Sequence, residues 1–123
     1  MKLSIVFPAL VLAGCASQSG TMQVGTSQSY SSLKDQREAV RAVKVLDVIP
    51  PGYKSTGVVD ASRCHRNTLD AVPLDDMVLT DMKVVAYGRG ADAVTDVQVT
   101  RESGLLKNCW LIITARGTML VKD

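Results

Sequence analysis

Two hydrophobic periods alternate along the chain, and they predict where strands and a helix lie. Residues 43–48 form a run rich in β-branched residues that ends at Pro-Pro-Gly, residues 50–52, a strong turn signal. A second strand is predicted over residues 53–61, centred on Gly-Val-Val. Residues 62–72 are polar and contain Cys64, so a loop is predicted there.

A helical period covers residues 73–87, where apolar side chains recur three or four positions apart. Pro73 suits the first helical position, and the aspartates that follow complement the positive end of the helix dipole. Gly88 is predicted to end the helix as a left-handed cap. Residues 33–41 are mixed and charged, and they fit either a helical turn or the approach to a strand.

Three apolar segments follow the helix. Strands are predicted over residues 93–101 and 109–115, and the second is broken by Gly117 and resumes over residues 118–121. The order ββαββ predicts an α+β fold, in which one main helix covers one face of a small antiparallel sheet of about four strands.

The N-terminus carries the parts of a secretory signal. Lys2 precedes an apolar run over residues 3–12, which is too short for the roughly 20 residues that span a bilayer. The run ends in Leu-Ala-Gly-Cys, which predicts a lipobox with cleavage before Cys15 and a lipid on its thiol. The alternatives are an ordinary signal peptide or a buried N-terminal strand. Ala16, where an aspartate would favour inner-membrane retention, favours the outer membrane.

This interpretation divides the chain into three parts. Residues 1–14 are the signal peptide, residues 15–32 a lipidated flexible tether, and residues 33–123 a periplasmic domain. Thirteen of the seventeen residues at 16–32 are Ser, Gln, Gly or Thr, and none is charged. Such a segment buries too little apolar surface to order itself, and its typical span is roughly 23 Å.

The charge balance excludes one class of partner. The formal net charge is +2, and it falls to +1 when the signal peptide, which contains Lys2, is removed. A protein that binds nucleic acid would carry a concentrated basic face, so no nucleic-acid partner is expected.

The remaining two cysteines form an even pair once Cys15 is assigned to the lipid. In a compartment that oxidises thiols, a Cys64–Cys109 disulfide is expected, and two independent buried thiols are the alternative. The disulfide would close a loop of about 46 residues and contribute on the order of 4 kcal/mol.

Catalytic and metal chemistry find little support. His65 adjoins Cys64, but it is the one histidine of the chain, whereas a zinc site needs three or four ligands. No third group orients a Cys64–His65 pair for nucleophilic catalysis. The G-x-G at residues 88–90 precedes a strand instead of opening a helix, which favours a turn over a phosphate loop. We expect no catalytic residue, no metal site, no cofactor and no enzyme activity.

Contact with a protein partner is the more plausible role for the polar residues near the cysteines. Arg63 and Arg66 flank Cys64 and suggest a small basic contact surface. Trp110 follows Cys109, where it either packs beside the disulfide or, if exposed, anchors a partner.

The second half of the chain resembles a known group. A helix followed by Gly-Ala-Asp-Ala-Val at residues 90–94, a strand, a turn and a terminal strand is similar to the domain of RcsF-type stress-sensor lipoproteins and YbjQ-type small proteins. The lipobox cysteine, the tether, Gly-Val-Val before Cys64, and Cys109 near the last strand pair occur in the same order. The resemblance covers roughly residues 53–121. RcsF-type domains have a second cysteine pair, absent from this sequence, and a longer, basic, proline-rich tether.

The resemblance implies an outer-membrane lipoprotein that senses envelope stress. It would engage an outer-membrane barrel protein and signal to an inner-membrane regulator. A structural lipoprotein subunit of an envelope or secretion assembly is the alternative, and a metal or small-ligand binder is a weaker one.

Overall fold

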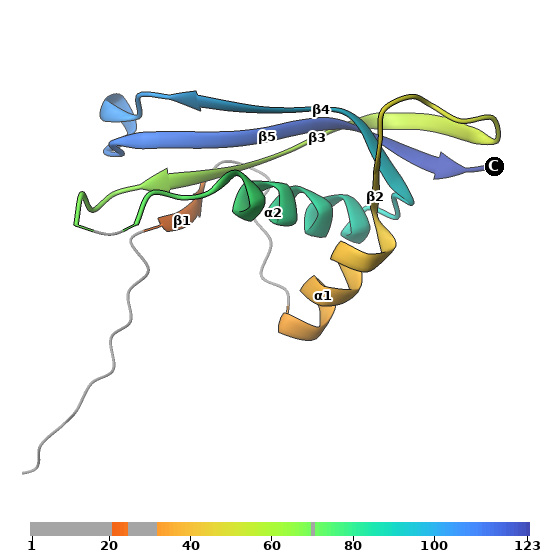
Figure 1. Cartoon of the computed structure of the whole chain (residues 1–123), viewed down its shortest axis with the longest axis horizontal. Helices are drawn as coiled ribbons and strands as arrows, with labels where there is room; N and C mark the ends of the chain where they lie inside the picture. Colours follow the sequence, from red (N-terminus) through yellow and green to blue (C-terminus); the bar gives the residue numbers. More distant parts are fainter. Residues whose placement is uncertain (1–20, 25–31, 70) are drawn as a thin grey trace, which may run out of the picture.

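A sheet with helices on one of its sides makes up the described part of the chain (Figure 1). The computed structural model describes residues 21–24, 32–69 and 71–123, so the predicted signal peptide, Cys15 and most of the predicted tether lie outside it. Its elements are, in chain order, β1 (Thr21–Val24), α1 (Leu33–Ala42), β2 (Lys44–Leu46), β3 (Tyr53–His65), α2 (Asp75–Gly88), β4 (Ala93–Glu102), the 3-10 turn η1 (Leu105–Lys107) and β5 (Leu111–Lys122).

The described residues form a five-stranded sheet of order β1-β3-β5-β4-β2. The α+β class is confirmed, but the expected four antiparallel strands and one helix are wrong in detail. β2 runs parallel to β4, with Lys44 opposite Ala93, whereas the other pairs are antiparallel. The sheet is mixed because of this one parallel pair. β2 and β3 are consecutive in the chain, but they lie at different places in the strand order and do not form a hairpin.

β3 is longer than predicted and continues through Cys64 to His65, where a loop was expected. Its polar residues are tolerated in the strand because they find partners on its neighbours. The hydroxyl oxygens of Ser62 and Thr114 lie 2.7 Å apart, and Arg63 reaches a carboxylate on α2. Polarity in this segment therefore marks internal hydrogen bonding and not an irregular loop.

Gly117 lies inside β5, which runs without the predicted break. Thr118, on the β3 side, stands opposite Val58, so the ladder is continuous there. On the β4 side the register shifts between Thr95 and Gln98, and a Cβ at position 117 would approach the Thr95 carbonyl oxygen and the Val97 side chain to 3.2 Å each. Glycine is used at this position because the bulged strand comes close.

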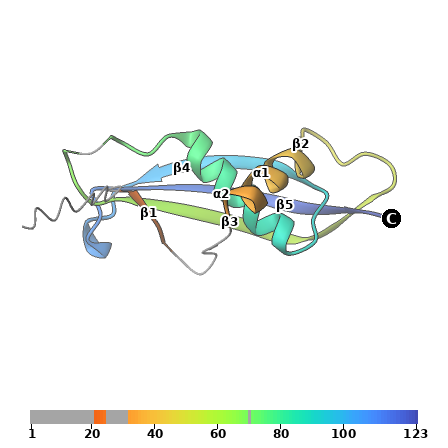
Figure 2. The same cartoon turned by 90° about the horizontal axis from the view of Figure 1, so that it is seen from below.

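The core lies between α2 and one face of β3, β4 and β5. The turns of α2 that face the sheet contribute Val78, Met82 and Ala86, which are fully buried against Val59 and Ile113. Seen from the helix side, α2 extends across the strands and α1 lies beside it (Figure 2). The opposite face of the sheet is mixed, because strand alternation places there the polar Asp60 and Arg116 but also the buried Cys64 and Ile112.

α1 decides the ambiguity of residues 33–41 in favour of a helix. Ser32 caps it by accepting a hydrogen bond from the Asp35 backbone N–H at 3.2 Å, and Ala39 packs fully buried. At the end of α2, Gly88 remains helical, contrary to its predicted role as a left-handed cap. Arg89 is the C-cap, and the left-handed residue is Gly90, with φ +83°.

β1 lies within residues 15–32, the predicted flexible tether, but it forms an edge strand of the sheet. It pairs antiparallel with the last four residues of β3, from Thr21 opposite His65 to Val24 opposite Ser62. Apart from β1, the structure describes one residue of the predicted tether, Ser32, which caps α1.

Candidate functional site: a groove beside α1 and a disulfide-linked tip

The disulfide between Cys64 and Cys109 is present and joins residues 45 positions apart, with 5.5 Å between their Cα atoms. Cys64 lies near the end of β3, and Cys109 lies just before β5. Both are buried and pack against Ile112, with Val24 of β1 alongside. The bond therefore links the end of β3 to the β4–β5 connection.

These two segments form one end of the molecule, which we call the tip and define as residues 66–69 and 104–110 (Figure 1, left). The backbone N–H of Trp110 donates to the His65 carbonyl at 2.8 Å, and that of Cys109 donates to the Gly104 carbonyl at 2.8 Å. The disulfide and the Trp110–His65 bond hold the two loops together, so their side chains are presented as one surface.

The tip exposes large apolar side chains. Leu106 is 104% exposed and Leu69 92%, while Leu105 and Trp110 are 68% and 56% exposed. Between the loops lies a hollow of about 140 Å³, whose lining residues are Arg66, Leu105, Asn108, Cys109 and Trp110. Two of the three predicted contact residues, Arg66 and Trp110, are thus brought together here.

Arg63, the third predicted contact residue, is directed elsewhere. Its Nε lies 2.7 Å and its Nη2 3.0 Å from the two carboxylate oxygens of Asp81 on α2. The side chains of Arg63 and Asp81 are only 19% and 8% exposed, and the amide of Gln23 on β1 donates to the same carboxylate at 3.2 Å. Asp81 therefore ties β1, β3 and α2 together within the fold, and Arg63 is its partner on β3.

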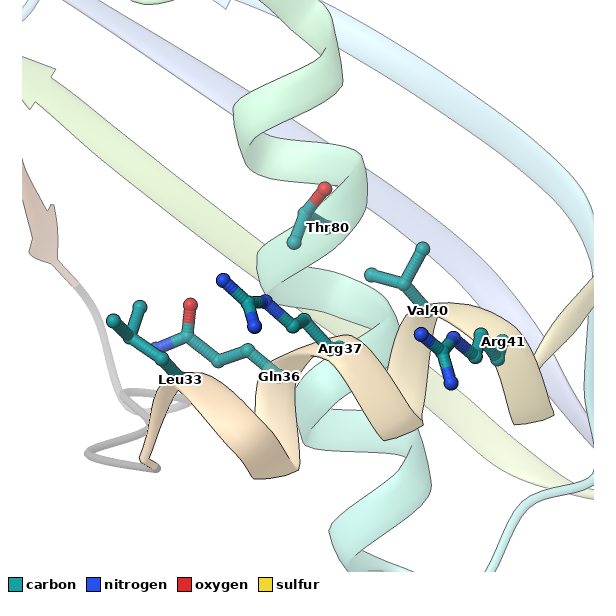
Figure 3. Close-up of a pocket in the computed structure, with 6 residues that line it drawn as sticks. All are labelled: Leu33, Gln36, Arg37, Val40, Arg41 and Thr80. Carbon is teal, nitrogen blue, oxygen red and sulfur yellow. The ribbon is translucent and has the colours of Figure 1, made fainter.

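A second concave surface, which sequence reasoning missed, lies between α1 and α2. This groove has a volume of about 310 Å³, and its lining residues are Leu33, Gln36, Arg37, Val40, Arg41 and Thr80. Figure 3 shows the α1 side chains directed along one side of that helix toward Thr80 on α2. Leu33 and Val40 are exposed, at 70% and 40%, and they give the groove an apolar floor.

The two arginines of the groove lie one helical turn apart on α1, so their positive charges repel one another. Within the described part of the chain, neither guanidinium has a carboxylate or hydrogen-bond partner. Two unneutralised cations beside exposed apolar side chains suit a ligand that is both anionic and apolar. In the sequence, the signal for this groove is the i, i+4, i+7, i+8 spacing of Leu33, Arg37, Val40 and Arg41, which has meaning only if residues 33–41 form a helix.

α1 is held against α2 partly through a hydrogen bond from the Tyr87 hydroxyl to the Glu38 carboxylate, at 3.0 Å. That hydrogen bond is the largest cause of a raised pKa of the Tyr87 hydroxyl, and partial desolvation and the charges of Glu38 and Asp35 add to it. Neither Glu38 nor Tyr87 lines the groove, so the bond positions α1 without occupying it.

Among the described residues, no group of three or more His, Cys, Asp or Glu could hold a metal ion, and no helix is long and apolar enough to cross a bilayer. His65 is buried, at 6% exposure, and its neighbour Cys64 is consumed by the disulfide. A scan of protein-family models finds no match to the chain, and a search of curated proteins finds none either.

Proposed function

We propose that this protein is an outer-membrane lipoprotein, anchored through Cys15, whose periplasmic domain binds another envelope protein. The lipobox pattern at residues 12–15 supports the anchor. The Cys64–Cys109 disulfide fits an oxidising compartment such as the periplasm, because cytosolic thiols are kept reduced.

The observation that carries the binding role is the groove beside α1. Its occupant is an acidic, amphipathic segment of a partner protein: an apolar side chain packs on Leu33 and Val40, and carboxylates pair with Arg37 and Arg41. A concave surface with two cations suits a protruding peptide better than a flat bilayer, which would call for a broader basic face.

Site-specific photocrosslinking tests this role. A photoreactive residue at Val40 should form an adduct with an envelope protein, through a peptide in which acidic residues adjoin apolar ones. Val58 is the matched control position, because it is 50% exposed and adjoins the buried Val59, so it points to the other face of the sheet. An equal yield of the same adduct from both positions would contradict the groove as the binding surface.

Charge removal separates specific binding from proximity. Arg37→Ala with Arg41→Ala should abolish the Val40 adduct, whereas Arg116→Ala should leave it intact. Arg116 is exposed and lies on the sheet face opposite α2, since its neighbour Ala115 is in the core. If the adduct survives loss of both groove arginines, charge pairing plays no part and the proposed ligand chemistry is wrong.

The specific version of this proposal is an RcsF-like stress sensor. It is supported by the order of the shared features, in which a cysteine before α2 is linked to a cysteine before the last strand. Deleting the gene should lower the response of an envelope-stress reporter to outer-membrane damage, and the groove variant should lower it similarly. An unchanged response together with an intact Val40 adduct would instead favour a structural subunit of an envelope assembly.

A further inference from the structure

The register of β1 fixes where the chain enters the folded domain. Thr21 stands opposite His65, the last residue of β3, and β1 then runs away from the tip toward Val24 opposite Ser62. Residue 21 is therefore beside the tip, and the far end of β3, at Tyr53, is twelve residues away. At about 3.3 Å per residue, that end lies roughly 40 Å from the tip.

This placement orients the domain relative to a membrane, and the inference rests on the lipid anchor at Cys15 proposed above. Only six peptide units separate Cys15 from Thr21, and even a fully extended chain spans at most about 3.6 Å per residue, or roughly 22 Å. Residue 21 must therefore lie within that distance of the lipid, and β1 holds residue 21 at the end of the sheet that carries the tip. The opposite end of the sheet has no such constraint.

The side chains of the tip suit a membrane surface. Its exposed apolar residues come from both loops and include Leu105 and Leu106 on the η1 turn, together with Trp110. Arg66 and Lys107 are the only charged residues of the tip, so its charge is purely positive. Tryptophan is favoured at the headgroup level, and basic residues near the surface are attracted by anionic lipids.

We propose that the tip is a second membrane contact, in which Leu105, Leu106 and Trp110 enter the interfacial region of the leaflet that carries the lipid anchor. Arg66 and Lys107 pair with phosphates of anionic phospholipids. A turn whose Leu106 side chain is fully exposed suits a fluid surface, whereas a protein contact of this kind would have to supply a matching pocket. The contact would hold the domain upright, with the groove beside α1 open to the periplasm.

Trp110 makes this testable, because it is the only tryptophan in the chain and reports on the tip alone. The lipidated full chain is reconstituted in vesicles of phosphatidylethanolamine and phosphatidylglycerol. Trp110 emission should shift to shorter wavelength, and lipids brominated near the headgroup end of the acyl chain should quench most of it. Leu105→Asp with Leu106→Asp should abolish both effects while the protein still sediments with the vesicles. Val48→Asp, at an exposed position in the β2–β3 connection, should change neither.

The outcomes separate this inference from the lipid anchor. Unquenched Trp110 in a protein that sediments with the vesicles would overturn the tip contact and leave the anchor standing. A mass spectrum without lipid on Cys15 would overturn the anchor and, with it, the orientation of the tip toward the membrane. A third outcome is that Trp110 is not quenched in the vesicles and its emission shifts only after envelope proteins are added. That result would show that the tip binds a protein instead.

Discussion

The ion pair between Arg63 and Asp81 predicts that Arg63 matters for stability and not for recognition. An exposed ion pair typically contributes about 0.2–1 kcal/mol, whereas removing one partner of a buried pair costs about 3–5 kcal/mol. With side chains 19% and 8% exposed and two N–H···O contacts, this pair lies nearer the buried limit. Arg63→Ala should therefore lower the free energy of unfolding by about 2–4 kcal/mol.

Urea unfolding of the oxidised domain, followed by circular dichroism, measures this loss. Arg66→Ala is the matched control, because it removes the same side chain three positions away, at an exposed site with no ion pair in the described structure. Its effect should stay within about 0.5 kcal/mol.

A double-mutant cycle isolates the pair itself. Arg63→Met combined with Asp81→Leu removes both charges and should recover part of the stability lost by Arg63→Met alone, because no buried carboxylate then lacks a cationic partner. Two results would refute the reasoning: an Arg63→Ala variant as stable as the Arg66→Ala variant, or a Val40 crosslink that depends on Arg63 in a folded protein.

Three further perturbations test other contacts. Replacing both cysteines of the disulfide with alanine should cost about 4 kcal/mol of unfolding free energy by chain entropy, and an equally stable reduced protein would contradict this. Gly104→Ala should cost about 1–3 kcal/mol, because its Cβ would lie 2.5 Å from the Cys109 Cβ, whereas Gly88→Ala, with open space around it, should stabilise. Because the pKa of Tyr87 is raised in the folded protein, the stability that its hydrogen bond to Glu38 contributes is fully present below the ordinary tyrosine pKa. That stability is lost as the pH rises through the raised pKa of the folded protein. Glu38→Gln should lower that pKa in an ultraviolet titration, and an unchanged titration would contradict the cause given.

The sequence predicted those parts of the fold whose burial follows a simple period. α2 and the central parts of β3 and β5 were recognised because apolar residues repeat on the face that meets the core. The Cys64–Cys109 pair also followed from counting cysteines. β1 was missed because its strand is stabilised by edge pairing and by Gln23 donating to Asp81, contacts that its polar composition does not reveal.

The candidate sites were predicted less well, since a contact residue in the sequence does not disclose its partner. Arg63 and Arg66 look alike in the sequence, but strand alternation directs Arg63 toward α2, and Arg66 lies beyond the strand's end. Arg37 and Arg41 were not predicted as contact residues, because residues 33–41 lack a strong apolar period. Their groove exists only once α1 packs beside α2.

The register shifts in the sheet also affect how the protein behaves at high local concentration. Beyond Ser62–His65 of β3 and Ala93–Thr95 of β4, no described strand covers the outer edges of these long strands. Each exposed edge is bent by a bulge, at Gly57 with φ +133° and at Asp96 with φ +52°. A bent edge is a poor template for a strand of another copy. A lipid anchor would confine many copies to one leaflet, where edge-to-edge pairing is most frequent, so these two irregularities would keep the crowded domains from joining their sheets.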